Sequence, residues 1–349
     1  MPSGDLVAYG ANMSHSDPFS AALDTIADPV SGKGLIESGR CAAPRVNAVD
    51  HIASVILDVT GLAGDDRAKI ERAIRGKLIG LEGVRDVRIA MTAEKTVHKL
   101  IVVGSGKGGV GKSTVAANIA VALKRLGVKV GLVDADIYGP SQARLLSTEG
   151  QRPEAENQKL IPINSPFGVP MLSMAHLVEP GQAIAWRGPM AGNALGQLID
   201  ADWGDAQVLI VDLPPGTGDV QLSLISKHKP AGAIIVSTPQ DLALIDATRA
   251  IDLFNQATVP IVGIVENMAG YACPHCGEVS DPFGAGGAEA AAAAIGAPFL
   301  GRIPLEIAIR KASDAGQPPA AGGEATAQPF LDIAGGLMGW LNGRAAPTF

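Results

Sequence analysis

The sequence predicts an α/β fold, a mostly parallel sheet with helices on both faces, preceded by a small α+β domain. Two observations carry this prediction. From residue 99 onward, aliphatic segments alternate with segments of helical periodicity, a pattern typical of consecutive β-α-β units. Hydrophobic residues make up 47% of the 349 residues and aromatic residues only 4%, an aliphatic composition that suits buried parallel strands.

The first part of the chain is expected to form a domain of its own. Residues 1–16 are polar and without pattern, which predicts a flexible tail, and residues 17–96 are predicted to be the small α+β domain. Its expected elements are a helix over 18–26, a strand over 51–59, a helix over 65–79 and a strand over 84–91. A short linker at 94–98 is expected to lead into the large domain, residues 97–349.

The large domain contains the alternating elements. Its expected strands are 100–104, 128–134, 208–213, 233–238, 260–266 and 298–303. Its expected helices are 112–126, 219–228, 242–255, 287–295 and 304–313, with a closing helix over 329–342. We expect residues 148–170 to be irregular, and 317–328, rich in proline, glycine and alanine, to be flexible.

A glycine-rich loop follows the first strand of the large domain. Residues 106–113, GKGGVGKS, match the phosphate-binding pattern G-x-x-x-x-G-K-[ST] at every fixed position. Glycines let backbone N–H groups turn toward phosphate oxygens, and the following helix directs its positive dipole end at the anion. Lys112 is expected to contact the β- and γ-phosphates, and the Ser113 hydroxyl to coordinate Mg²⁺. The other expected nucleotide contacts in this loop are Gly106, Lys107, Gly108, Gly109, Val110, Gly111 and Thr114.

Carboxylates end two of the expected strands. Asp134 and Asp136 lie two residues apart at a strand end, so they point to the same side, a placement that suits Mg²⁺-bound water and the attacking water. Asp212 ends the aliphatic run VLIV, as in a Walker B strand, which delivers a carboxylate to the magnesium shell. Glycines in the next segment, residues 213–219, allow a backbone that moves with the γ-phosphate.

A C-x-x-C pair, Cys273 and Cys276, lies in the late segment YACPHCGEVSDPFGAGG. Its spacing leaves four interpretations open: a disulfide-exchange pair, structural zinc, an iron–sulfur cluster, or a pair without function. Zinc and a [4Fe-4S] cluster each need four ligands, and two copies of the pair across a two-fold axis would supply four thiolates. We expect His275 to lie beside the site or face solvent, and Cys41 to be incidental.

Together these motifs resemble the deviant Walker A ATPases: ParA, MinD, nitrogenase iron protein and the Mrp/ApbC iron–sulfur carriers. The early lysine of GKGGVGKS carries the resemblance, and implies that Lys107 reaches the nucleotide of a partner subunit in a homodimer. DADIYGPS, DLPPGTGD and CPHCG followed by FGAGG resemble the Mrp/ApbC branch in particular. The resemblance spans about residues 17–343, and implies that Asp136 positions the attacking water while Asp134 supports the metal shell.

An Mrp/ApbC-type protein would be an ATP-binding carrier with slow ATPase activity. The resemblance implies a [4Fe-4S] cluster held by Cys273 and Cys276 of both subunits and passed to apo-proteins, with scaffold proteins as further candidate partners. It also implies that Asn267 contacts adenine, since an amide offers both a donor and an acceptor. DPVSGKGLIESGR resembles a small domain of iron–sulfur assembly proteins, but residues 60–64, TGLAG, lack the cysteine of standalone relatives, so we expect docking or regulation there.

Composition argues against several other classes of protein. The net charge of −7 disfavours nucleic acid or an anionic membrane as the main partner, and no run of about eighteen apolar residues predicts a membrane span. The first residues show no signal peptide, and three cysteines make no disulfide framework, so we expect a reduced protein in the cytoplasm. The alternatives are a ParA/MinD-like positioning ATPase, which the missing basic surface disfavours, and a zinc-stapled dimeric scaffold.

Overall fold

The computed structural model describes residues 17–47, 49–62, 64–92, 98–178, 188–216, 218–323 and 325–343, with backbone alone at 64, 188–189, 219 and 241–246. The tail expected at 1–16, most of the linker expected at 94–98, and Thr217 lie outside the described residues. The chain divides into two compact units, Met1–Lys95 and Thr96–Phe349.

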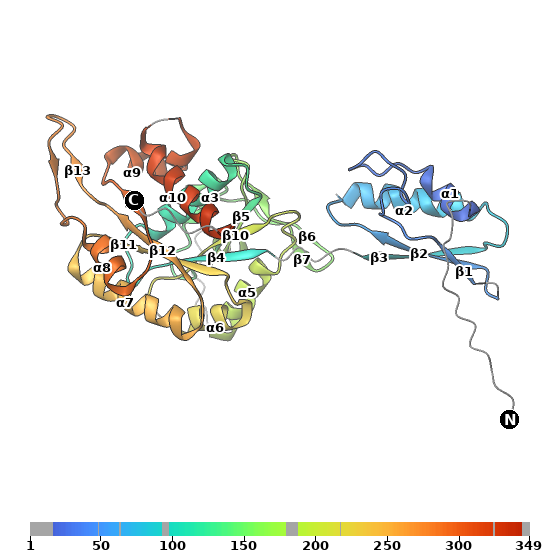
Figure 1. Ribbon diagram of the computed structural model, residues 1–349, viewed down its shortest axis with the longest axis horizontal. Coiled ribbons are helices and arrows are strands. Elements are labelled where there is room, and N and C mark those ends of the chain that lie inside the picture. Colours follow the sequence, from blue (N-terminus) through green and yellow to red (C-terminus); the bar gives the residue numbers. More distant parts are fainter. Residues whose placement is uncertain are drawn as a thin grey trace, which may run out of the picture. The chain divides into compact units, whose positions relative to one another are not determined.

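The first unit is a small sheet with helices on one face (Figure 1). Its elements are α1 (Pro18–Asp24), β1 (Arg45–Asn47), β2 (Ile52–Asp58), α2 (Gly64–Leu78) and β3 (Asp86–Thr92). β2 lies between β1, which is antiparallel to it, and β3, which is parallel. Alternate residues of β2, Ala53, Val55 and Leu57, are buried with the apolar residues of both helices, as the two-residue period of a strand requires. Cys41 is buried in the same core, and burial raises the pKa of its thiol to about 12.

The second unit is built on a mostly parallel sheet, as expected. The strands of this sheet are β4 (Lys99–Gly104), β5 (Val130–Asp134), β8 (Ile163–Asn164), β9 (Pro170–Ser173), β10 (Val208–Asp212), β11 (Gly232–Ser237), β12 (Ile261–Asn267) and β15 (Phe299–Ile303). Their order is β15-β12-β11-β4-β10-β5-β9-β8, and neighbours are parallel except that β8 is antiparallel to β9.

Helices cover both faces of this sheet (Figure 1). They are α3 (Lys112–Arg125), α5 (Gly188–Ile199), α6 (Asp219–His228), α7 (Asp241–Gln256), α8 (Gly287–Ile295), α9 (Ile307–Asp314) and α10 (Gln328–Leu341). On β4, Ile101 and Val103 pack with α3 and α10, whereas Val102 faces the core formed with α5, α6, α7 and α8. None of the described helices is both long and apolar enough to cross a membrane.

The stretch 148–170, expected to be irregular, contains short paired strands. β6 (Ala155–Glu156) and β7 (Lys159–Leu160) pair with each other, while β8 and β9 extend the central sheet. The helix α5 was not predicted either. Strands of two to four residues carry too little periodicity for a sequence pattern to reveal them.

The expectation that residues 317–328 are flexible is wrong for the described part of that stretch. Short 3₁₀ turns form at Pro319–Ala321 and Ala325–Ala327, and Ala320 is fully buried. The Ala320 N–H donates to Oδ1 of Asn118 on α3 at 2.8 Å. Small residues and prolines are common in flexible linkers, but here they allow the segment to pack closely on α3. Composition alone cannot distinguish a flexible linker from such a packed segment.

Candidate nucleotide site and cysteine hairpin

The carboxyl ends of β4, β5 and β10 meet at one edge of the sheet. β10 lies between the other two, and its register pairs Asp212 with Val103 on one side and with Asp134 on the other. The loop after β4 leads into α3, whose first residue is Lys112. Strand order and register therefore bring both carboxylates to the start of this helix, where α/β proteins bind ligands.

The glycine-rich loop borders a hollow of about 220 Å³. The hollow is lined by Ser105, Lys107, Gly108, Gly109, Val110, Gly111, Lys112, Ser113, Thr114, Asp136 and Pro215. Gly109 and Gly111 have φ angles of 82° and 80°, in the left-handed region that favours glycine. At Gly111 an added Cβ would also lie 2.2 Å from Nδ2 of Asn267, whereas at Gly109 it would meet nothing within 4 Å. Among the expected nucleotide contacts, only Gly106 and Asn267 do not line the hollow.

Lys112 forms a buried ion pair with Asp212. The two side chains are 6% and 0% exposed, so the pair is almost completely shielded from solvent. The other carboxylate oxygen of Asp212, Oδ2, accepts a hydrogen bond from Gln142 Nε2 at 2.8 Å. A buried carboxylate is costly unless it is paired and hydrogen-bonded, and here both conditions hold.

Asp134 and Asp136 have different surroundings despite their spacing. Asp134 is fully buried, and its Oδ2 accepts hydrogen bonds from Gln142 N–H at 3.0 Å and Ser173 Oγ at 2.8 Å. Burial, together with the nearby charge of Asp212, raises the pKa of Asp134 to about 7. Asp136 lines the hollow, and its Oδ1 accepts from the backbone N–H of Tyr138 at 3.0 Å. Of the two, Asp136 is the carboxylate placed to meet a bound molecule.

Lys107 and Asn267 both contact other parts of their own chain. Lys107 Nζ donates to Oε1 of Gln240 at 3.4 Å, just before α7. Asn267 ends β12, is 8% exposed, and donates from Nδ2 to the carbonyl oxygen of Val110 at 2.8 Å. Asn267 therefore supports the glycine-rich loop from the side, in contact with its backbone.

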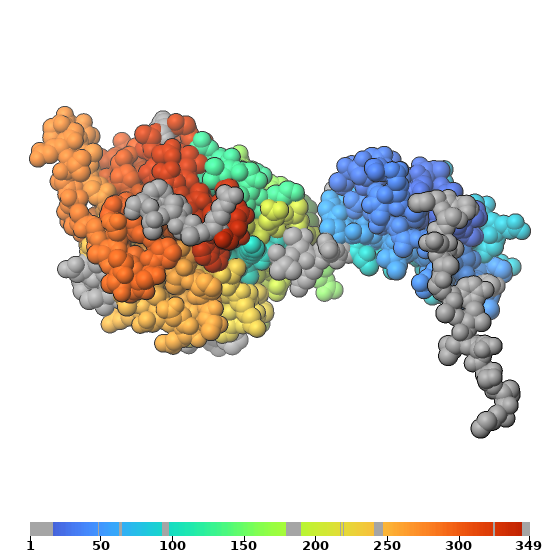
Figure 2. All heavy atoms as spheres, viewed as in Figure 1, coloured from blue at the N-terminus to red at the C-terminus, as the bar shows by residue number. Residues whose placement is uncertain are grey.

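The C-x-x-C pair lies in the turn of a hairpin, β13 (Tyr271–Ala272) and β14 (Val279–Ser280), which extends away from the rest of its unit (Figures 1 and 2). The N–H of Cys273 donates to Glu278 O at 2.9 Å, and the N–H of Gly277 donates to Cys273 O at 2.8 Å. Cys273 is partly exposed and Cys276 is exposed, and both are free thiols.

The hairpin turn favours a thiolate at Cys273. A hydrogen bond from the backbone N–H of Cys276, followed in importance by one from His275, lowers the pKa of Cys273. A thiolate is the form that binds metal. Within the described residues, no group of three or more His, Cys, Asp or Glu side chains gathers where it could hold a metal ion. A single copy of the described chain thus offers two thiols at this hairpin.

Gln142 and Ser173 are the site residues that sequence reasoning missed. Each holds an oxygen of Asp134 or Asp212, and both are fully buried. Gln142 follows the segment DIYGPS directly, which was the available hint, but glutamine is usually an exposed residue and carries no motif by itself. Ser173 ends β9, a strand that was not predicted.

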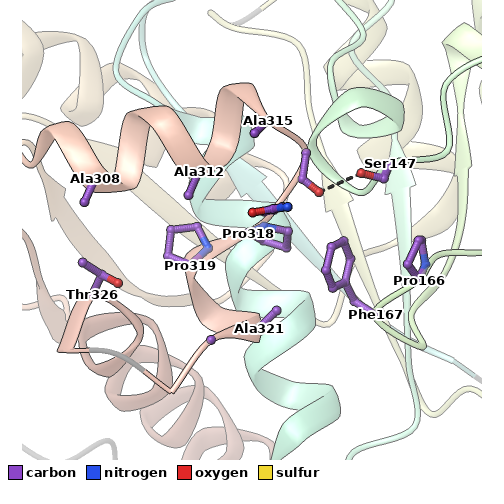
Figure 3. A pocket seen from close by; sticks show the side chains of 13 residues that line it. Ser147, Pro166, Phe167, Ala308, Ala312, Ala315, Pro318, Pro319, Ala321 and Thr326 are labelled. Carbon is purple, nitrogen blue, oxygen red and sulfur yellow. Dashed lines mark hydrogen bonds between the residues drawn. The ribbon is translucent and has the colours of Figure 1, made fainter.

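A second hollow, of about 560 Å³, lies beside α9 and is shown in Figure 3. Its walls include Pro166, Phe167 and Pro319 and a row of alanines on α9, Ala308 and Ala312. Ser147 Oγ donates to the carbonyl oxygen of Gly316 at 2.8 Å at one side of it. The lining residues are mostly small or apolar, the polar ones are Ser147, Gln317 and Thr326, and none carries a charge that would pair with phosphate or a metal ion.

Known proteins with the same features were found by sequence and by structure. The model of the ParA family described as a NUBPL iron-transfer P-loop NTPase matches residues 96–338. An iron-sulfur cluster carrier protein of Deinococcus radiodurans is 46% identical over 314 residues, covering 87% of this chain and 88% of the relative. An Arabidopsis thaliana protein, the iron-sulfur protein required for NADH dehydrogenase, mitochondrial, is 49% identical over 225 residues, 64% of this chain and 71% of that relative.

Solved structures agree with the sequence relatives. A nucleotide-binding protein from Archaeoglobus fulgidus in complex with ADP aligns with a TM-score of 0.58 at 38% identity, over 67% of this chain and 91% of that one. MinD cell division protein of Aquifex aeolicus aligns with a TM-score of 0.53 at 24% identity, over 72% and 100%, which indicates a shared fold. The matched family model covers well over half of the chain, and the chain belongs to the ParA family, as an iron-transfer P-loop NTPase of the NUBPL type.

Proposed function

We propose that this protein is an ATP-dependent carrier of iron–sulfur clusters that works as a homodimer. Two copies would hold one [4Fe-4S] cluster between Cys273 and Cys276 of each, and would pass it to apo-proteins. The observation that carries the proposal is the hairpin itself: two free thiols, close in the chain and accessible, in a chain that also has a nucleotide hollow.

The number of thiols supports a dimer. A [4Fe-4S] cluster takes four thiolates, and one hairpin offers two, so two hairpins complete the set. The lowered pKa of Cys273 favours the thiolate that such a cluster needs. The same composite arrangement fits the role proposed for Lys107, which would leave Gln240 and reach the nucleotide bound to the partner subunit.

ATP would bind in the hollow at the glycine-rich loop. The loop N–H groups and the start of α3 would hold the phosphates, and Lys112 would exchange its contact with Asp212 for one with the β- and γ-phosphates. Asp136, which lines the hollow, would orient the attacking water. Asn267 would add an adenine contact through the part of its amide that Val110 does not use.

The residues at the strand ends fit a magnesium ion. Hard oxygen donors of the kind Mg²⁺ prefers are present: the Ser113 hydroxyl as a direct ligand, and the carboxylates of Asp212 and Asp134 behind it. Bound there, Mg²⁺ would neutralise phosphate charge during slow hydrolysis. Apo-proteins as acceptors, scaffold proteins as further partners and a cytoplasmic location remain predictions.

Anaerobic reconstitution tests the proposal. The protein is loaded with iron and sulfide, and iron, labile sulfide, visible absorption and molar mass are measured for the unsubstituted chain and for a Cys273→Ser/Cys276→Ser variant. We expect about four irons per two chains and a dimeric mass for the former, and loss of both iron and sulfide in the latter. Cys41→Ala is the matched control, because Cys41 is buried in the first unit and should not affect loading.

Two outcomes would contradict the proposal. Equal iron in the unsubstituted chain and the double variant would remove the cysteine pair from cluster binding. Zinc without labile sulfide, bound by the same cysteines, would support the zinc-stapled scaffold instead.

A further inference from the structure

Gln142 connects the elements that build the nucleotide site. It is the first residue of α4 (Gln142–Leu145) and is fully buried. Its backbone N–H donates to Asp134 Oδ2 at 3.0 Å, and its side-chain Nε2 donates to Asp212 Oδ2 at 2.8 Å and to Ser113 O at 2.9 Å. One residue thus ties together the ends of β5 and β10 and the first turn of α3.

The hydrogen bonds determine which way the amide faces. Ser113 O and Asp212 Oδ2 can only accept, so the amide nitrogen must point toward them. The amide oxygen, Oε1, is then directed elsewhere, and it is buried with no hydrogen-bond partner among the described residues. An unpaired buried acceptor is destabilising, so a residue held this firmly is expected to have a donor in the functional state.

Magnesium-bound water is the donor that the proposed function brings to this place. Two carboxylates, Asp134 and Asp212, lie beside Gln142, and Lys112 forms an ion pair with Asp212. Once Lys112 turns to phosphate, Asp212 keeps Gln142 as its hydrogen-bond donor and has one oxygen free. Hydrated magnesium supplies both the positive charge and the water O–H groups that these acceptors need.

We propose that Gln142 is a positioning residue for magnesium: Nε2 fixes Asp212 so that its other oxygen faces the metal shell, and Oε1 accepts a hydrogen bond from metal-bound water. The inference rests on the proposed function, since it requires that the hollow bind Mg-ATP. It differs from a purely structural role in one measurable respect. Loss of Gln142 should weaken nucleotide binding only when magnesium is present.

The test compares affinities with and without the metal. Binding of a non-hydrolysable ATP analogue is measured by calorimetry in Mg²⁺ and in EDTA, for the unsubstituted full-length protein and for Gln142→Met, which conserves side-chain volume. We expect Gln142→Met to weaken binding about tenfold or more in Mg²⁺, as loss of a charge-assisted hydrogen bond does, and less than about twofold in EDTA. If the Met variant does not fold, Gln142→Asn, whose amide is too short to bridge both acceptors, carries the same comparison.

Asn118→Leu is the matched control. Asn118 is also a fully buried amide that donates to a carbonyl oxygen of α3, Thr114 O at 2.9 Å, but its partners do not include Asp212. Its loss should lower thermal stability and leave the ratio of the two affinities unchanged.

The results separate the inference from the function on which it rests. An equal loss in Mg²⁺ and EDTA, or no loss in either, would overturn the role of Gln142 while Mg-ATP binding by the unsubstituted protein stands. Absence of ATP binding by the unsubstituted protein would refute the proposed function, and the inference with it.

Discussion

Gly111→Ala tests how the glycine-rich loop is held in shape. Gly111 has a φ of 80°, which an alanine adopts at a cost of about 1–2 kcal/mol. Its new Cβ would lie 2.2 Å from Nδ2 of Asn267, so the amide must move and give up its bond to Val110 O. Leaving that buried carbonyl unpaired costs about 1–3 kcal/mol more. We expect Gly111→Ala to lower the free energy of unfolding by about 2–5 kcal/mol in total.

Gly109 provides the matched control for this prediction. Its φ of 82° is nearly the same, but nothing lies within 4 Å of an added Cβ. Gly109→Ala should therefore cost only the backbone strain, about 1–2 kcal/mol. Urea unfolding followed by circular dichroism measures both variants against the unsubstituted protein.

A double-mutant cycle isolates the steric clash between the new Cβ at position 111 and the Asn267 amide. In an Asn267→Ala background the amide is already gone, so Gly111→Ala should cost no more than Gly109→Ala does. The two single changes at Gly111 and Asn267 are then non-additive by about 1–3 kcal/mol. Additive effects, or equal costs for Gly109→Ala and Gly111→Ala, would refute the idea that Asn267 fixes the loop.

Three further predictions concern single groups. Because burial raises the pKa of Asp134 to about 7, above the ordinary 3.8, the folded protein holds a proton that the unfolded chain releases between these values. The free energy of unfolding should fall by about 1–4 kcal/mol as pH rises through this window, and should level off above it. Urea titrations across pH 4–8 measure this change, and the pH profile of Asp134→Asn should be flatter. In the iron-free reduced protein at pH 7, iodoacetamide should modify Cys273, whose pKa is lowered, and spare buried Cys41 until denaturant is added, whereas equal rates by mass spectrometry would contradict this. Ala320→Glu should destabilise the second unit by about 3 kcal/mol or more, because it buries a charge against α3, whereas Ala321→Glu at the exposed neighbour should change little; equal melting temperatures would contradict the packing seen there.

Features that depend on neighbours in the chain could be predicted from sequence. The start of α3 follows from the glycine-rich pattern that precedes it, and Lys112 and Ser113 are placed by the motif alone. The aliphatic run that ends in Asp212 predicted β10 nearly to the residue. These elements are continuous and strongly patterned, which is the condition under which periodicity is informative.

Features that depend on residues distant in the chain could not be predicted from the sequence. β9 is a strand because β5 lies beside it, and Ser173 at its end meets Asp134 for the same reason. Asn267 was expected to face the adenine, and the structure adds a contact with Val110 O that a motif search cannot show.

The sequence by itself determined the glycine-rich loop, the alternation of the strongly patterned strands and helices, and the cysteine pair, because each consists of consecutive residues with a recognisable spacing. Only the tertiary structure decided which side chains around the loop form hydrogen bonds with one another. Strand order places Asp134 beside Asp212, although β5 and β10 are far apart in the chain. Gln142 bridges the two carboxylates from a helix that the sequence pattern did not predict. Hydrogen bonds of a buried amide depend on which groups the fold brings within about 3 Å, and the linear chain carries no direct record of that distance.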